Sequence, residues 1–145
     1  MHEDIRWKQR YSNYRGMLNA LNRNLQHDDI PSEFVESIQI AIGKSFELCF
    51  ELMWKLLKDY LEHEDIDIGL ISPRNVLKAA ANAGLLQRIG VDGNILMQAL
   101  KIRNELAHIY DQEKLCIALE GVREVFFPEM LKIGNYFGKL ADADD

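Results

Sequence analysis

Residues 33–62 read EFVESIQIAIGKSFELCFELMWKLLKDYLE, and this stretch predicts a long helix at the centre of the fold. Its apolar residues recur every three or four positions, as they do on one face of an α-helix. The main apolar seam consists of Val35, Ile38, Ile42, Phe46, Cys49, Met53, Leu56 and Tyr60. Further apolar residues widen this seam, namely Phe34, Ala41, Leu48, Leu52 and Trp54. A seam this wide indicates burial on several sides, so we expect other helices to pack around residues 33–62.

The segments on both sides of this central helix also show helical patterns. Residues 7–25 carry apolar side chains at alternating steps of four and three, and the acidic, proline-containing segment 28–32 ends this pattern. Ser72-Pro73 predicts the start of a short helix over residues 72–83, because serine caps helices and proline suits the first helical position. Gly84 is well suited to end that helix.

Two more helices are expected in the C-terminal half. After a glycine-rich turn at residues 90–94, apolar spacing predicts a helix over residues 95–107. Asp111 is a plausible cap for a last helix that extends to Leu140, with a kink at Pro128 because its apolar residues keep their phase across the proline. The acidic residues 141–145 are expected to form a frayed tail.

These patterns predict an all-α protein that forms a single domain over residues 1–145. Strand-like alternation, internal repeats and Gly/Ser linkers do not occur in the sequence. The simplest arrangement is an up-down antiparallel four-helix bundle with residues 72–83 as one extra short helix. A chain of 145 residues with 48% hydrophobic content is long enough to bury a core of this kind.

The composition limits the possible partners and compartments. A formal net charge of −6 provides no overall attraction for nucleic acid, so any RNA contact must depend on a local basic patch. Cys49 and Cys116 lie among apolar neighbours and predict buried free thiols, which together with the absence of Cys-x-x-Cys favours a reducing, cytoplasmic setting. No apolar run approaches the roughly 20 residues of a membrane span, and residues 1–4 are charged, so we expect no contact with a membrane.

Chemically useful side chains gather at the end of the predicted helix 95–107. Arg103 and Tyr110 are seven residues apart, which would place them on one helix face, and Asn104 and His108 are four apart on the adjacent strip. Together they would present a guanidinium, a phenol, an amide and an imidazole in one place. Arg103 also follows two leucines on a partly apolar strip, where an arginine is poorly solvated unless it is paired or lies at a cleft. A solvated helix end is the alternative interpretation.

Acidic residues on the central helix could support this group. Glu47, Glu51 and Lys55 follow one another at intervals of four, and Glu51 with Lys55 has the favourable orientation for an ion pair. These residues are either a solvated charged face or the source of a carboxylate that orients Arg103 from a neighbouring helix.

Other charged residues have two interpretations as well. Arg74 and Lys78, four residues apart, could add positive charge beside the Arg103 group or could simply be solvated. Asp65-x-Asp67 resembles a metal-binding pair, but a helix end precedes it where a phosphate-holding Gly-Ser turn would be needed. We therefore interpret this pair as part of a solvated loop and expect no metal site.

The residues around this group resemble a known family. Arg103-Asn104-x-x-x-His108 matches the HEPN signature, and Tyr110 matches its longer form. Residues 46–58 and 72–78 are similar to the corresponding blocks of the HEPN subfamily called nucleotidyltransferase substrate-binding proteins, and the resemblance covers roughly residues 34–115. It implies a HEPN four-helix bundle that forms a homodimer with its signature residues near a shared cleft. Such proteins are usually encoded beside a separate minimal nucleotidyltransferase, MNT.

Two functions are implied by this resemblance. In the first, the chain is the toxin of a toxin-antitoxin pair, a metal-independent ribonuclease that is silenced when MNT transfers AMP from ATP to Tyr110. In the second, it is a non-catalytic substrate-binding subunit of a two-chain nucleotidyltransferase. In both, the chain itself needs no cofactor, and ATP is used by the partner.

The residue chemistry is compatible with RNA cleavage. His108 could act as base or acid, because an imidazole can both take up and release a proton in the neutral pH range, while Arg103 could bind the phosphate and Asn104 could orient the phosphate or the imidazole. One such histidine per chain is too few for two separate proton transfers. A two-fold symmetric dimer would supply the second, which is a physical reason to expect one.

Overall fold

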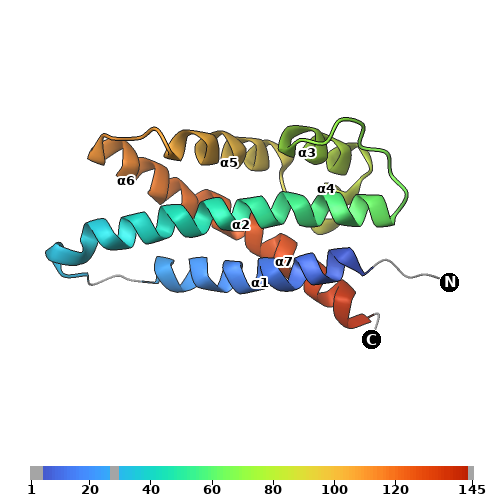
Figure 1. Cartoon of the computed structure of the whole chain (residues 1–145), viewed down its shortest axis with the longest axis horizontal. Coiled ribbons are helices and arrows are strands. Elements are labelled where there is room, and N and C mark those ends of the chain that lie inside the picture. Colours follow the sequence, from blue (N-terminus) through green and yellow to red (C-terminus); the bar gives the residue numbers. More distant parts are fainter. Residues whose placement is uncertain (1–4, 27–29, 144–145) are drawn as a thin grey trace.

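The computed structural model describes residues 5–26 and 30–143, and every regular element within them is a helix. Four helical runs, α1, α2, α5 and the continuous α6 to α7 run, alternate in direction along the length of the molecule (Figure 1). This arrangement confirms the predicted all-α bundle. The elements are α1 (Arg6–Leu25), a 3-10 turn η1 (Ser32–Phe34), α2 (Val35–His63), α3 (Pro73–Asn82), α4 (Leu85–Ile89), α5 (Gly93–Leu106), α6 (Gln112–Gly121), a π-helical segment η2 (Val122–Phe126) and α7 (Phe127–Ala143).

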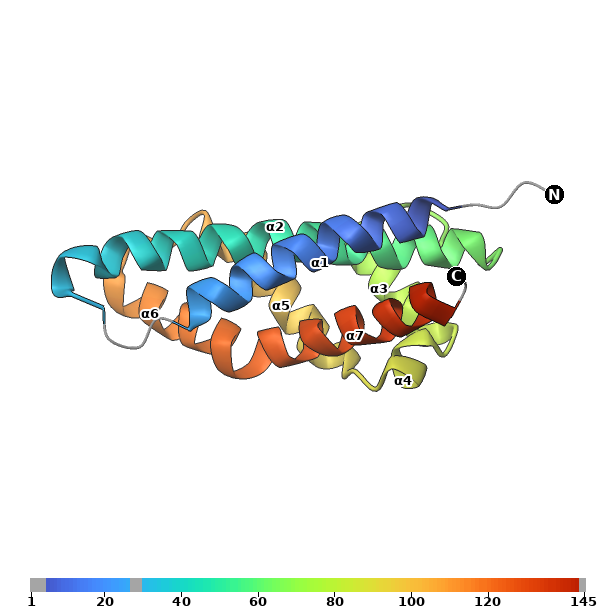
Figure 2. The same cartoon turned by 90° about the horizontal axis from the view of Figure 1, so that it is seen from below.

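Helix α2 lies at the centre of the bundle, as its wide apolar seam predicts. Helix α1 runs beside it on one side, while α3 and α5 lie along another side, and α7 closes the bundle against α1 (Figures 1 and 2). The core contains fully buried side chains from three of these helices, namely Tyr14, Leu18, Phe46, Phe50, Met53, Leu57, Ile133 and Phe137. The central helix therefore supplies a rigid support for any group that α5 presents to it.

A second short helix, α4, differs from the expectation of a single extra helix. Gly84 and Gly90 adopt left-handed conformations with φ of 80° and 88°, and they enclose the five residues of α4. Left-handed glycines end helices, and five residues are too few to show helical periodicity in a sequence. Leu85 and Leu86 are nevertheless fully buried, so α4 fills the end of the core near α7.

The irregularity in the last helical run lies one turn before the predicted kink. Residues 122–126 form a π-helical segment, and Pro128 follows it at the start of α7. Proline lacks an N–H and its ring crowds the carbonyl four residues earlier, here that of Glu124, so the widened π turn accommodates the strain. Helix α7 includes residues 141–143 of the predicted tail, and Ala141 packs against the core. Parts of three sequence predictions lie outside the described residues: the charged start (residues 1–4), the helix break (residues 28–29) and the tail (residues 144–145).

The two cysteines differ, although both were expected to be buried. Cys49 is buried in α2, whereas Cys116 is exposed on α6. Helix α6 buries only Ala118 and Leu119, so its first turn stays at the surface, where Gln39 Nε2 lies 3.2 Å from the Cys116 sulfur. None of the helices in the described part of the chain is both sufficiently long and sufficiently apolar to serve as a transmembrane segment.

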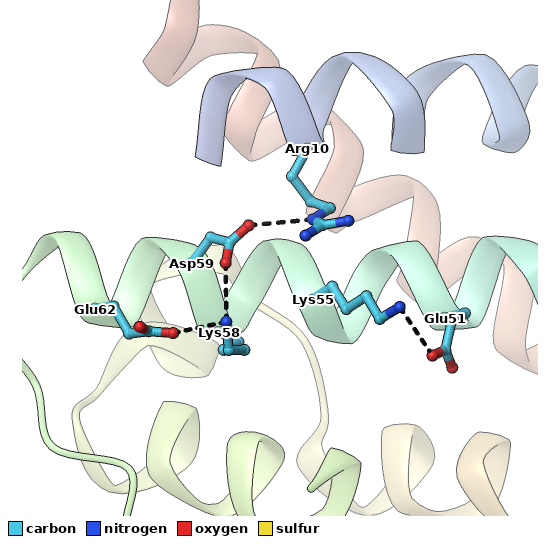
Figure 3. Close-up of polar contacts among 6 residues, drawn as sticks. All are labelled: Arg10, Glu51, Lys55, Lys58, Asp59 and Glu62. Atoms are coloured by element: carbon cyan, nitrogen blue, oxygen red, sulfur yellow. Dashed lines mark hydrogen bonds and ion pairs between the residues drawn. The ribbon is translucent and has the colours of Figure 1, made fainter. Parts of the chain in front are cut away.

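We expect an Asp59→Ala variant to lose about 2 kcal/mol of unfolding free energy. Asp59 is 3% exposed and joins α1 to α2, because its carboxylate accepts from Arg10 Nε at 3.1 Å and Lys58 Nζ at 3.3 Å (Figure 3). Removing the carboxylate leaves two cations with fewer partners. Urea unfolding measures the loss, with the exposed Asp142→Ala as control, and equal stability of the two variants would contradict the structural role of Asp59.

Candidate functional site

Arg103 lies in the last turn of α5 and reaches the middle of α2. Asp92 caps the start of α5, its carboxylate accepting from the Asn94 N–H at 2.8 Å, and the helix then runs to Leu106. Arg103 Nη2 donates to Glu51 Oε2 at 2.5 Å, and both side chains are 30% exposed. The structure thus shows the carboxylate from a neighbouring helix that the spacing along α2 suggested.

Glu51 is held from its own helix as well. Trp54 Nε1 donates to Glu51 Oε2 at 3.0 Å, and Lys55 Nζ lies 3.3 Å from Glu51 Oε1 (Figure 3 shows the Lys55 pair). Partial burial acts to raise the pKa of Glu51. Hydrogen bonds from Trp54 and Lys55 and the charges of Arg103 and Lys55 act in the opposite direction and are stronger together, so the pKa is lowered. The carboxylate therefore stays ionised and oriented toward α5.

The second contact of Arg103 is with Asn104. Arg103 Nη1 donates to Asn104 Oδ1 at 3.0 Å, and the Asn104 side chain is exposed. A guanidinium has five N–H groups, and these two contacts use two of them within the described part of the chain. The remaining donors are available to an anionic ligand such as a phosphate group.

His108 and Tyr110 do not lie on the helix that carries Arg103. Helix α5 ends at Leu106, and the His108 N–H donates to the Glu105 carbonyl at 2.8 Å in the turn that follows. The expected shared helix faces are therefore wrong. The chain must reverse here so that α6 can begin at its Asp111 cap, whose carboxylate accepts from the Glu113 N–H at 2.9 Å. Residues 107–111 serve as this connection, and His108 and Tyr110 are both exposed on it.

Tyr110 is the most accessible of the five tyrosines. Its side chain is 91% exposed, while Tyr14 and Tyr60 are buried and Tyr11 and Tyr136 are partly buried. The Tyr14 and Tyr60 hydroxyls donate to the Met130 carbonyl and the Glu64 carboxylate respectively. Within the described residues the Tyr110 hydroxyl makes no hydrogen bond, so it is open to a reagent from solvent.

Glu47 lies beside this connection, separate from the Arg103 contacts. It lines a shallow hollow of about 260 Å³ together with Leu106 and Ile109, and its carboxylate is 3.9 Å from Lys44 Nζ. Glu47 therefore lies beside the 107–111 connection, and within the described residues no hydrogen bond or ion pair joins it to Arg103. Of the two predicted carboxylates, only Glu51 contacts Arg103 within the described residues.

Arg74 and Lys78 are both exposed on α3, and the structure does not bring Lys78 to Arg103. Lys78 lines a hollow with Asp92 and Gly93 at the start of α5. Arg103 is ten residues further along α5, about 15 Å away at the rise of an α-helix. Arg74 makes no hydrogen bond or ion pair within the described residues. In the same part of the chain, no group of three or more His, Cys, Asp or Glu side chains could hold a metal ion.

Sequence reasoning missed Trp54 as a member of the site. The apolar spacing places Trp54 only on the seam of α2, whereas its indole N–H donates to Glu51. The available signal was its position three residues after Glu51, a spacing at which side chains meet on a helix. A buried indole also needs a hydrogen-bond acceptor, and Glu51 was the nearest candidate in sequence.

The described part of the chain folds as an all-α helical bundle of HEPN-like type. A family model described as nucleotidyltransferase substrate binding protein like matches residues 9–137, which include α2, α5 and the connection with Tyr110. The chain belongs to this family, which confirms the resemblance seen in the sequence. No curated protein matches the chain.

We expect Glu51→Gln to change the pH dependence of stability. Because the pKa of Glu51 is lowered in the folded protein, the carboxylate stabilises the fold above its ordinary pKa of 4.5, and this stabilisation disappears as pH falls through the lowered value. The difference in unfolding free energy between wild type and Glu51→Gln should therefore be larger at neutral pH than below about pH 4.

Urea unfolding at neutral and acidic pH measures this difference. Glu120→Gln, at an exposed site on α6, is the matched control and should show little change with pH. A Glu51→Gln effect that is the same at both pH values would contradict the lowered pKa.

Proposed function

We propose that this chain is the RNA-cleaving partner of a separate minimal nucleotidyltransferase, which silences it by transferring AMP to Tyr110. The observation that carries the proposal is the exposure of Tyr110, 91%, on the short connection that directly follows the helix of Arg103 and Asn104. The family match supports an association with a nucleotidyltransferase, since that enzyme is part of the family's description.

The cleavage requires no metal ion. A base removes the proton of the RNA 2'-hydroxyl, the resulting oxygen attacks the adjacent phosphorus, and an acid protonates the departing 5'-oxygen. His108 acts as base or acid, a contribution of about 10²- to 10⁴-fold. Arg103 donates its remaining N–H groups to the phosphate oxygens, and Asn104 holds the guanidinium in place.

The two proton transfers need two histidines and therefore two chains. His108 is exposed on the 107–111 connection, and within the described residues its side chain has no hydrogen-bond partner. It can therefore face a second copy of the chain. A two-fold symmetric homodimer brings the two connections together and supplies the second imidazole.

AMP transfer to Tyr110 would block the RNA-cleavage site that contains His108. The Tyr110 oxygen attacks the α-phosphorus of ATP, pyrophosphate leaves, and the phenolic proton passes to a base of the nucleotidyltransferase. The product carries a negatively charged phosphodiester and an adenosine two residues from His108. Both its charge and its bulk oppose the approach of RNA.

A second function is a non-catalytic substrate-binding subunit of a two-chain nucleotidyltransferase. Two observations favour it. The ion pair with Glu51 neutralises part of the Arg103 charge, and the chain has a net charge of −6. In this function the exposed 107–111 connection would contact the enzyme and Tyr110 would not be modified.

One experiment separates these functions. The purified protein is incubated with total RNA in the presence of a chelator, either directly or after treatment with the nucleotidyltransferase, Mg²⁺ and ATP. We expect cleavage by the untreated homodimer and a loss of cleavage after treatment. A stable complex with the nucleotidyltransferase, without cleavage in either sample, would contradict the ribonuclease and support the subunit.

A further inference from the structure

Trp54 and Arg103 bind the same carboxylate oxygen from opposite sides of the helix interface. Trp54 Nε1 donates to Glu51 Oε2 at 3.0 Å from within α2, and Arg103 Nη2 donates to it from α5. We propose that Trp54 is a positioning residue of the Arg103 site: its indole N–H fixes the Glu51 carboxylate, and Glu51 in turn fixes the direction of the guanidinium. The proposal deepens the proposed function, and its consequence for RNA cleavage rests on that function.

The burial of Trp54 makes it a fixed donor. The residue is 9% exposed, so packing limits the rotation of its ring and the N–H points in one direction. An indole has only two side-chain torsions, and a buried indole N–H is costly to leave without an acceptor. Glu51, with 30% of its side chain exposed, would otherwise be free to turn toward solvent.

The ring of Trp54 also influences Glu51 Oε1, through Lys55. Lys55 Nζ lies 5.9 Å from the centre of the Trp54 ring and 3.3 Å from Glu51 Oε1. A cation over an indole face is attracted to it, so the ring helps to hold the ammonium beside the carboxylate. Both oxygens of Glu51 are thus held by groups that depend on the position of one aromatic ring.

The consequence lies in how Arg103 presents its remaining donors. With Nη2 bound to Glu51 and Nη1 bound to Asn104, the plane of the guanidinium is set by two contacts. A preorganised donor stabilises a developing phosphate charge without reorganising during the reaction. If the Glu51 carboxylate becomes mobile, Arg103 keeps its charge but is no longer held in one orientation. The rate of the chemical step should then fall more than the affinity for RNA.

The test replaces Trp54 with phenylalanine, which keeps an aromatic ring in the core and removes the N–H. Trp7→Phe is the matched control, because Trp7 is the other tryptophan of the chain, is 2% exposed, and packs on Tyr60 at 5.5 Å and Phe137 at 5.8 Å without contacting Glu51. Both variants are first shown to be folded by circular dichroism. Two measurements are then made without RNA: the pKa of Glu51 from its carboxyl carbon resonance, and the mobility of Arg103 from the ¹⁵N relaxation of Nε.

We expect Trp54→Phe to raise the pKa of Glu51 toward its ordinary value of 4.5 and to increase the mobility of Arg103, with no change in Trp7→Phe. In a Glu51→Gln background, Trp54→Phe should add no further mobility, because Trp54 acts through Glu51. For RNA cleavage, we expect kcat to fall about 5- to 10-fold in Trp54→Phe with KM nearly unchanged.

Unchanged Glu51 and Arg103 signals in Trp54→Phe, or equal changes in Trp7→Phe, would overturn the proposal. Both results are independent of catalysis. A wild-type protein without ribonuclease activity would contradict the proposed function, while the two resonance measurements would still determine whether Trp54 positions Glu51 and Arg103.

Discussion

Replacing Tyr110 with phenylalanine is expected to abolish AMP transfer to the chain by the nucleotidyltransferase. The change removes only the attacking oxygen and leaves a ring of the same shape on the connection. The other four tyrosines are buried or partly buried, so they offer no replacement acceptor of equal access. Transfer of label from α-³²P-ATP to the protein measures the effect directly.

Tyr136→Phe is the control for this experiment, because Tyr136 is partly buried and packs at 5.3 Å from Phe137. This variant should accept AMP on Tyr110 to the same extent as wild type. The silencing of RNA cleavage by nucleotidyltransferase and ATP should also disappear in Tyr110→Phe. Label incorporation at the wild-type level in Tyr110→Phe would rule out Tyr110 as the acceptor.

Replacing Arg103 or His108 with alanine is expected to reduce metal-free RNA cleavage by about 10²-fold or more. In the proposed mechanism, Arg103→Ala removes the charge that stabilises the pentacoordinate phosphorus, and His108→Ala removes the proton-transfer group from both chains of the proposed homodimer. The initial rate of cleavage of a labelled single-stranded RNA in the presence of a chelator gives the measurement.

Arg23→Ala is the matched control, since Arg23 is exposed in the last turn of α1 and its side chain makes no hydrogen bond or ion pair with α5 in the described part of the chain. Its cleavage rate should equal that of wild type. If all three variants cleave RNA as fast as the wild type, the roles of Arg103 and His108 are wrong. Circular dichroism at the assay temperature shows whether each variant is folded, so that a loss of cleavage is not due to unfolding.

The fold could be predicted from the sequence because its main elements are long and periodic. The apolar seam from Val35 to Tyr60 spans about seven helical turns, so it specifies both the helix and its central position. Helix α4 could not be found in the same way, because five residues between two left-handed glycines contain too little periodicity. The π-helical segment 122–126 depends on how the helix relieves the crowding of Pro128, which the apolar phase does not indicate.

Helical spacing could predict only those site residues that lie within α2 and α5. The sequence left two interpretations for Glu51, a solvated charged face or a carboxylate that orients Arg103, and the hydrogen bond from Arg103 supports the second. The placement of His108 and Tyr110 did not follow, because the sequence offers no strong helix-ending residue between Leu106 and the Asp111 cap. Helical spacing was therefore extended past the true end of α5. Side-chain contacts such as that of Trp54 with Glu51 depend on side-chain orientation, which only the structure shows.

We propose that Tyr110 is the AMP acceptor of a chain that cleaves RNA. Peptide mass spectrometry after incubation with the nucleotidyltransferase, Mg²⁺ and ATP shows whether AMP is attached to this residue. We predict an increase equal to AMP on the peptide that contains Tyr110, with fragment ions that place the AMP on this residue. An unmodified Tyr110 peptide, in the presence of a nucleotidyltransferase that is active toward another acceptor, would contradict the claim.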